Sequence, residues 1–225
     1  MGIFYAGIGG RKIVYKTIKS EARDEFEEKK STFIGYAKRV ETEEEAKEFI
    51  NKIKSVNREA RHNVYAYIIG ENKGIQRYSD DGEPQGTGGI PVLEVIKKNQ
   101  LTDTVIVVTR YFGGVLLGAG GLTRAYTKGA SIAVKAGGVV DKVHAHELNV
   151  KVDYDLLGKL QYVAEQKLWF VKDIKYGENV TITFICEDCE SIEEEIIDIS
   201  RGKASIIKEK AKIYFKEENN YYENQ

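Results

Sequence analysis

The segment Asp103–Ala130 constrains the fold of this chain more than any other part of its sequence. It starts with a run of β-branched residues, Val105–Thr109, which is typical of a strand that is buried on both faces. A glycine-rich loop follows, and from Leu122 the spacing of apolar and small residues becomes that of an amphipathic helix. The sequence therefore predicts a buried strand, a loop and a helix in direct succession.

Basic side chains flank this loop. Arg110 closes the predicted strand, and Arg124 and Lys128 lie four residues apart on one face of the predicted helix. A glycine-rich loop between a strand and a helix N-terminus, with cations nearby, is a common arrangement for binding an anion. Alternatively, the glycines only permit a tight turn and close packing of the helix on the sheet.

A second unusual segment, Arg77–Gly89, contains the acids Asp80, Asp81 and Glu83. Pro84 and several glycines keep it from joining a regular helix or strand. Such carboxylates can hold a divalent cation or act as acid and base, although acidic turns are often only solvated. The role of the acidic turn therefore stays open at the level of the sequence.

These segments and their neighbours resemble the IMPACT/YigZ family, in its bacterial two-domain form. The motifs that carry the resemblance are Ala60–Tyr67 (ARHNVYAY), Ser79–Pro84 (SDDGEP), Gln85–Gly89 (QGTGG), Thr109–Gly114 (TRYFGG) and Leu117–Tyr126 (LGAGGLTRAY). The main resemblance covers Lys29–Gly138, and the region after it is similar to the small C-terminal domain of bacterial members. Asn57, Val64 and Gly88 depart from the usual pattern, in which His, Cys and Ala are common at these positions.

The resemblance implies an α+β fold with two domains. We expect an N-terminal domain at 1–140, with the β-α sheet fold shared by a ribosomal small-subunit protein and domain IV of translation factor G. A ferredoxin-like C-terminal domain is expected at 141–216, followed by a polar, frayed tail at 217–225. Eukaryotic relatives are implied to act in translational control, by competing for a partner that activates a starvation-responsive kinase of a translation initiation factor.

Composition limits the classes of protein that fit. Hydrophobic residues make up 42% and charged residues 31% of 225 residues, as in soluble globular proteins. Lysine plus arginine (34) nearly equals aspartate plus glutamate (35), so any basic surface must be local. There is no apolar run of about 18 residues, and Met1–Lys12 lacks the features of a signal peptide. We therefore expect a cytoplasmic protein that does not enter the membrane.

The only cysteines, Cys186 and Cys189, form a single CxxC motif. One CxxC is half of a zinc site at best, and only His62, His144 and His146 could complete it. We therefore expect no metal, no cofactor and two free thiols.

Hydrophobic periodicity and turn residues predict the remaining elements. In the first domain these are strands at 12–18, 25–40, 63–70 and 75–79, a helix at 42–56 that opens with the capping box of Thr42 and Glu45, and a helix at 90–99. The free N–H groups of Thr87–Gly89, at the start of the second helix, are expected to point at solvent or a ligand. In the second domain the predicted elements are strands at 143–152, 169–175, 180–186 and 205–215 and helices at 154–167 and 191–200, in the order βαββαβ.

A non-catalytic regulator linked to translation, which binds RNA or the ribosome through a glycine-rich basic groove, is the leading functional hypothesis. Cations interspersed with aromatic residues suit RNA surfaces. The candidate binding residues are Arg61, His62, Arg77, Arg110, Tyr111, Gly113, Gly114, Gly120, Gly121, Arg124 and Lys128. One alternative is a protein-interaction module in translational or stress control without nucleic-acid contact. Another is a phosphate-handling hydrolase that uses the acidic turn, although no nucleophile elbow or Walker loop is present.

Two structural predictions follow from the leading hypothesis. The Ser79–Pro84 turn and the Thr109–Arg124 segment should face each other across one groove. Substitution of Arg110 or Arg124 by alanine should weaken anion or RNA binding without unfolding the protein.

Overall fold

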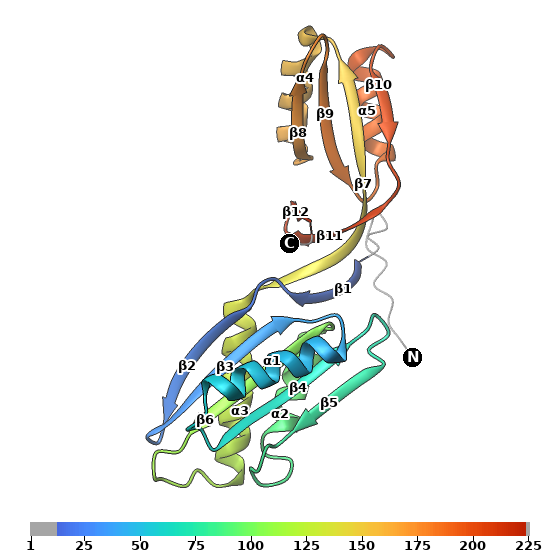
Figure 1. Cartoon of the computed structure of the whole chain (residues 1–225). Coiled ribbons are helices and arrows are strands. Elements are labelled where there is room, and N and C mark those ends of the chain that lie inside the picture. The colour runs from blue at the N-terminus through green and yellow to red at the C-terminus, as the bar shows by residue number, and fades with distance from the viewer. Residues whose placement is uncertain (1–12, 224–225) are drawn as a thin grey trace. The chain divides into compact units, whose positions relative to one another are not determined.

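The computed structural model describes residues 13–223, and the chain divides into two compact units. The first, Tyr15–Val140, is called the N-terminal domain here, and the second, built mainly from Asp141 onward, the C-terminal domain. Each combines helices with a β-sheet (Figure 1). The prediction of an α+β protein with two domains is therefore confirmed.

The N-terminal domain contains a five-stranded antiparallel sheet in the order β2-β3-β6-β4-β5. Its strands are β2 (Ala22–Glu28), β3 (Ser31–Arg39), β4 (His62–Ile69), β5 (Ile75–Ser79) and β6 (Thr104–Tyr111), and β1 (Ile13–Ile18) precedes them. The single strand predicted at 25–40 is wrong. It is a hairpin, because Lys29 and Lys30 take positive φ angles of 47° and 64° and turn the chain back on itself.

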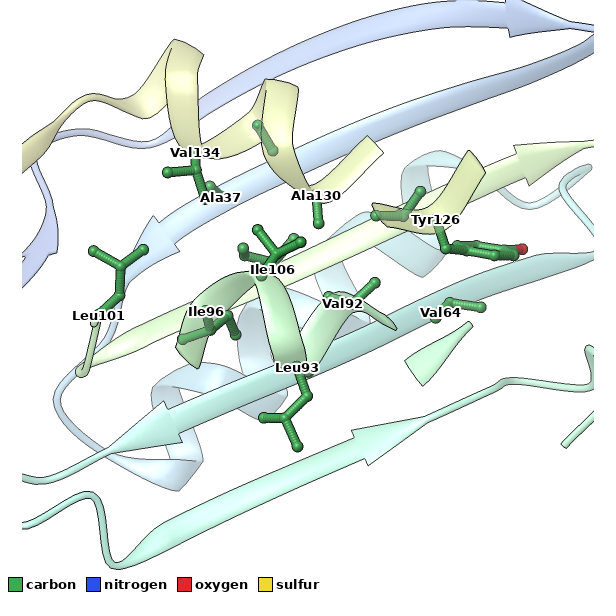
Figure 2. Packing of buried hydrophobic residues seen from close by; sticks show 14 of the residues in the cluster. Ala37, Val64, Val92, Leu93, Ile96, Leu101, Ile106, Tyr126, Ala130 and Val134 are labelled. Carbon is green, nitrogen blue, oxygen red and sulfur yellow. The ribbon is translucent and has the colours of Figure 1, made fainter. Parts of the chain in front are cut away.

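Helices cover both faces of this sheet (Figure 1). The helix α1 (Glu43–Val56) packs on one face against alternate residues of β6, among them Val105 and Val107. The helices α2 (Gly89–Lys98) and α3 (Ala119–Gly137) pack on the other face, where Figure 2 shows Ile106 between them. The strand is thus buried on both faces, as its β-branched run predicts.

The long helix α3 approaches the sheet at a pair of glycines. A Cβ atom on Gly35 of β3 would lie 2.1 Å from the carbonyl oxygen of Gly129 on α3, and one on Gly129 would lie 2.7 Å from Cγ1 of Val108. Neither distance is tolerable, so glycine is required at both positions. This contact fixes how α3, and with it the loop before it, lies on the sheet.

The C-terminal domain has the predicted element order β7 (Val139–Val152), α4 (Tyr154–Gln166), β8 (Phe170–Tyr176), β9 (Val180–Cys186), α5 (Glu190–Ser200) and β10 (Ser205–Lys208). The strand β9 lies between β7 and β8 and is antiparallel to both, and β10 pairs with the other edge of β7. This is the split βαββαβ arrangement of ferredoxin-like domains.

The last segment of the chain is not the frayed tail that its polar composition predicts. The single strand predicted at 205–215 is wrong, because the range is divided between β10 and a second strand, β11 (Lys212–Glu217). β11 pairs with β7 and forms a hairpin with β12 (Asn220–Tyr222). Tyr221 anchors the hairpin, since its ring packs 5.4 Å from Phe170 and 6.2 Å from Tyr214, centre to centre. Across residues 13–223, no helix has both the length and the apolar character needed to span a membrane.

Candidate functional site

The candidate site lies at the end of β6, on the face of the sheet that α2 and α3 cover. Arg110 on β6 pairs in register with Phe33 on β3 and with His62 on β4. Directly paired residues of an antiparallel sheet point to the same face, so these three side chains lie in a row. Val108, two residues earlier, belongs to the core on this face, which fixes the side on which Arg110 lies.

Arg110 is buried, with only 5% of its surface exposed. Its Nη1 atom donates a hydrogen bond of 2.7 Å to Oε1 of Glu83. The guanidinium carbon lies 5.5 Å from the centre of the Phe33 ring and 5.3 Å from that of Phe112. Arg110 is therefore not an exposed cation, because it is buried and a carboxylate of the chain itself neutralises it.

Glu83 is the centre of this buried network. Besides the Arg110 bond, its Oε1 atom accepts a hydrogen bond of 2.8 Å from the Tyr126 hydroxyl on α3 and lies 4.0 Å from Nε2 of His62. Burial, and after it the charge of Glu83, raises the pKa of the Tyr126 hydroxyl, which therefore stays protonated and donates. Through Glu83 the acidic turn is tied to β6 and α3 at once.

The carboxylate of Asp80 lies at the N-terminus of α2, where the sequence predicted free N–H groups that point at solvent or a ligand. Its carboxylate accepts hydrogen bonds from the backbone N–H groups of Gly86 (2.8 Å), Gly88 (3.0 Å) and Gly89 (2.8 Å) at the start of α2. Burial opposes ionisation, but the three backbone donors hold the pKa of Asp80 below its ordinary value. The expectation that these N–H groups face a ligand is therefore wrong, since the turn supplies its own anion.

Asp81 has internal partners as well. Its Oδ1 atom lies 2.6 Å from Nζ of Lys54, and its Oδ2 atom accepts a 2.7 Å hydrogen bond from the backbone N–H of Asn63. Its carbonyl oxygen lies 2.9 Å from Nδ1 of His62, which must carry the hydrogen because a carbonyl only accepts. Each acid of the turn thus binds the protein itself. Within residues 13–223, no group of three or more His, Cys, Asp or Glu side chains is arranged to hold a metal ion.

Residues from the acidic turn and from the glycine-rich segment line one pocket of about 410 Å³, which we call the Arg110 pocket. Its lining residues are Arg61, His62, Glu83, Pro84, Arg110, Phe112, Leu116, Leu117, Gly118, Ala119 and Leu122. The wall is mainly apolar, and most of its polar atoms come from β4, the acidic turn and β6.

A smaller pocket of about 200 Å³, the Lys128 pocket, lies on the other side of Leu117, which lines both. Its lining residues are Phe26, Glu28, Lys29, Leu117, Gly121, Arg124, Ala125 and Lys128. The Nζ atom of Lys128 lies 4.1 Å from the centre of the Phe26 ring, within the range of a cation–π contact. Arg124 and Lys128 therefore share a recess, as their four-residue spacing on one helix predicts.

Two of the candidate side chains lie elsewhere. Tyr111 follows Arg110 directly, so its side chain points to the opposite face of the sheet, where its hydroxyl donates a 2.9 Å hydrogen bond to Asn57. Arg77 pairs in register with Tyr67, which belongs to the core under α1. Arg77 and Tyr111 thus lie on the α1 face, and the structure separates them from both pockets.

The loop glycines divide into packing and conformational positions. A Cβ atom on Gly113 would lie 1.8 Å from the carbonyl oxygen of Lys30, and one on Gly121 would lie 2.9 Å from Cβ of Leu117. Gly114, with a φ of 82°, has open space around it, and a Cβ on Gly120 would contact only the end of the Arg124 side chain, at 3.6 Å. Close packing explains the first two, and none of the four requires a bound anion.

The expectation of two free thiols in the C-terminal domain is wrong. Cys186, at the end of β9, and Cys189, directly before α5, are joined in a disulfide with a Cα–Cα distance of 5.2 Å. The turn between them brings the two side chains together, and both are buried. The CxxC motif is thus closed on itself.

Sequence reasoning placed aromatic rings among the cations but missed most of the apolar part of the site. Phe112, Leu116 and Leu117 lie in the loop between β6 and α3, and Phe26 comes from the edge strand β2. Phe112 and Leu116 keep 38% and 82% of their surface exposed. Large apolar residues inside a loop of glycines were the available signal, since nothing in a short loop obliges it to carry them.

The fold and the site define a class: a two-domain α+β protein in which a buried acid locks an acidic turn against a glycine-rich strand–loop–helix segment. The sequence matches the model of the Impact N-terminal domain over residues 29–134 and that of a domain of unknown function (DUF1949) over residues 150–203. IMPACT family member YvyE of Bacillus subtilis is 45% identical over 194 residues, covering 85% of this chain and 89% of that protein. The chain belongs to the IMPACT family, and the resemblance to IMPACT/YigZ proteins is confirmed.

Other relatives are consistent with this assignment. An IMPACT family member of Haemophilus influenzae is 36% identical over 198 residues, covering 85% of this chain and 95% of that protein. An IMPACT homologue of Dictyostelium discoideum is 40% identical over 94 residues, covering 40% of this chain and 27% of that protein. A solved structure, described as that of a hypothetical protein, superposes with a TM-score of 0.56 at 27% identity and covers 86% of this chain and 96% of its own.

Proposed function

We propose that the protein is a non-catalytic regulator linked to translation, and that its N-terminal domain binds single-stranded RNA or ribosomal RNA. The binding surface consists of Lys29, Arg61, Arg124 and Lys128, which we call the cationic rim, together with Phe112. Membership of the IMPACT family supports the link to translation, through the translational role that the resemblance implies for its eukaryotic members.

One observation carries the proposal: the cations around the two pockets are exposed and unpaired. Among the residues that the structure describes, none of the four rim cations has a carboxylate within 4 Å, and all four are exposed, in contrast to Arg110, which is buried and binds Glu83. Arg61 and Lys128 instead lie over the rings of Phe112 and Phe26, at 5.8 and 4.1 Å. Unpaired cations beside exposed aromatic rings are what proteins use to contact phosphates and stack bases.

The contacts of the acidic turn argue against the hydrolase alternative. Asp80 caps α2, Asp81 binds Lys54 and the backbone, and Glu83 binds Arg110 and Tyr126. A general base or a metal ligand would have to give up one of these contacts before it could act. The turn is therefore better explained as a structural lock.

The test is binding of the purified protein to total RNA and to ribosomes across a salt series. The variant Arg61→Ala/Arg124→Ala/Lys128→Ala should bind more weakly at low salt. If each cation contacts one phosphate, the slope of log affinity against log salt should fall by about 2 for single-stranded RNA. All three side chains are exposed, so the melting temperature should stay close to that of the wild type.

A matched control carries the same change in charge at exposed positions away from both pockets, Arg77→Ala/Lys98→Ala/Lys135→Ala. It should bind as the wild type does. Equal losses in both triple variants would mean that only net charge matters, and the absence of saturable binding by the wild type at low salt would exclude RNA as the ligand.

A protein partner is the second candidate, because the loop before α3 exposes a small apolar patch. Val115 and Leu116 keep 40% and 82% of their surface exposed, beside Phe112. Exposed apolar groups within a cationic surface also suit a protein contact. In that case Leu116→Ser should abolish capture of the partner, while an increase in salt should change it little.

A further inference from the structure

The Arg110 pocket has features of a small-molecule site that contact with RNA phosphates does not explain. Its volume of about 410 Å³ lies within the range of ligand pockets in proteins. Pro84, Phe112, Leu116, Leu117 and Leu122 provide an apolar wall. An apolar body of a few carbon atoms fits this wall better than a phosphate, which requires polar contacts on all sides.

The polar side of the pocket is cationic. It holds the guanidinium groups of Arg61 and Arg110 and the carboxylate of Glu83, so with His62 neutral it carries one net positive charge. Glu83 neutralises Arg110, while Arg61 has no carboxylate within 4 Å among residues 13–223. The charge that a ligand has to balance is therefore that of Arg61, at the mouth of the pocket.

Arg110, which lines the pocket, also has a hydrogen-bond donor without an acceptor. The Nε atom of Arg110 is buried and has no hydrogen-bond partner within the described part of the chain, whereas Nη1 binds Glu83. A buried donor without an acceptor is unfavourable and uncommon in native proteins. Arg110 borders the pocket, so an acceptor atom seated there, after a small shift of the guanidinium, can satisfy it.

We propose that the Arg110 pocket binds a small monocarboxylate with a compact apolar body. The carboxylate balances Arg61 and accepts from Nε of Arg110, and the apolar body packs on Phe112 and Leu122. This ligand goes beyond RNA binding: it shares Arg61 and Phe112 with the proposed RNA surface, but the Lys128 pocket and its cations take no part in it. The same chemistry is offered by a free acid and by the C-terminal residue of a peptide.

The test is a titration with 4-methylpentanoate, followed by chemical shifts of backbone amides in the full chain. For about eight non-hydrogen atoms, we expect a dissociation constant on the order of 1 mM, with shifts confined to residues around the pocket. The uncharged amide of the same acid should bind at least fivefold more weakly. N-acetyl-leucine distinguishes the two sources: tighter binding than 4-methylpentanoate points to a peptide C-terminus and weaker binding to a free acid.

Three variants connect binding to the pocket. Arg61→Gln, at an exposed position, should remove the preference for acid over amide, and Ala119→Phe should abolish binding by filling the pocket. Lys98→Gln, with the same change in charge at an exposed position outside the pocket, should bind as the wild type does. The proposal is overturned if the folded wild type shows no shifts well above 1 mM, if the amide binds as well as the acid, or if Ala119→Phe leaves binding unchanged. The variant Arg124→Ala/Lys128→Ala, which keeps Arg61, separates the two proposals: it should weaken RNA binding and leave this titration unchanged.

Discussion

Replacing Glu83 by alanine should destabilise the N-terminal domain by about 3–5 kcal/mol. Glu83 and Arg110 form a buried ion pair with a 2.7 Å hydrogen bond, and their side chains are only 4% and 6% exposed. Without Glu83 the guanidinium stays buried with no opposite charge, and the Tyr126 hydroxyl loses its acceptor as well. The loss should greatly exceed that expected from a surface ion pair, which is about 0–1 kcal/mol.

The pair itself, in contrast, contributes little net stability if its desolvation offsets its attraction. The double variant Glu83→Met/Arg110→Met replaces both charged side chains with unbranched apolar ones of similar length. We expect it to lie within about 2 kcal/mol of the wild type, since buried ion pairs are often replaced by apolar residues without loss. The single variants Glu83→Met and Arg110→Met should each be as damaging as Glu83→Ala, because each leaves one buried charge without its partner. The coupling energy of the cycle should therefore be several kcal/mol.

Unfolding in urea, followed by two probes, measures these changes. Far-ultraviolet circular dichroism reports both domains, whereas fluorescence reports Trp169, the only tryptophan of the chain. Trp169 packs edge-on against Phe184 in the core of the C-terminal domain, with ring centres 5.7 Å apart. Its transition should move little in all variants and serves as an internal control. Two probes are needed because a two-domain chain need not unfold in one step.

Two results would refute this reasoning. A loss below about 1 kcal/mol in Glu83→Ala would mean that the pair behaves like an exposed one. A double variant as unstable as the sum of its single variants would mean that the two side chains are not coupled. Either outcome would restore Arg110 as a side chain that can leave Glu83 and reach a ligand from the surface.

Three further predictions concern other parts of the fold. Asp80→Ala should cost about 2 kcal/mol, because the backbone N–H groups of Gly86, Gly88 and Gly89, at and before the start of α2, lose a charged acceptor. Asp80→Asn should cost less, and equal losses would argue against the role of the charge. Gly35→Ala should lower the free energy of unfolding in urea by at least about 2 kcal/mol, because its methyl group would clash with α3. Gly158→Ala on α4, whose methyl group would meet nothing within 4 Å, should raise the free energy of unfolding by at most about 1 kcal/mol. A hydrogen bond from the Tyr214 hydroxyl is the largest cause that lowers the pKa of Glu147 to about 2. Glu147 therefore contributes at most about 3 kcal/mol to the stability of the C-terminal domain. This contribution is complete above pH 4.5 and is lost as the pH falls toward 2. Tryptophan fluorescence in urea should show this loss in the wild type and not in Glu147→Gln.

The sequence predicted the elements well where periodicity was strong and turn residues were clear. The β-branched run of β6, the Thr42 cap of α1 and the βαββαβ order of the C-terminal domain all appear in the structure. Of the predicted capping box, the return bond differs, because the Glu45 carboxylate accepts from the N–H of Glu41. The prediction failed where a tertiary contact decided the outcome. The strand predicted at 25–40 is interrupted by a turn at Lys29 and Lys30, which have positive φ angles. Lysine is not a typical turn residue, so the sequence does not indicate this turn. Residues 220–222 form a strand because Tyr221 packs on Tyr214 and on Phe170, and Phe170 lies far away in the sequence.

For the site, the sequence brought the right segments together but assigned the wrong roles within them. The acidic turn and the glycine-rich segment do line one pocket. Which acid would serve which donor depended on register: Asp80 meets the start of α2, and Glu83 meets Arg110, 27 residues later in the chain. No local sequence pattern indicates a contact between two residues that are so far apart in the chain. Binding of RNA by the cations that remain exposed is still a prediction.

The pairing of Arg110 with Glu83 also changes what the substitution of Arg110 by alanine can be expected to do. As an exposed phosphate contact, Arg110 could be removed with a loss of binding only. As a buried cation it cannot, because its removal leaves Glu83 buried without its charge partner and the acidic turn without its link to β6. A loss of RNA binding in that variant would therefore say nothing about phosphate contacts unless its stability were measured as well. Arg61, Arg124 and Lys128 have no such internal partner among residues 13–223, so they, and not Arg110, can separate binding from folding.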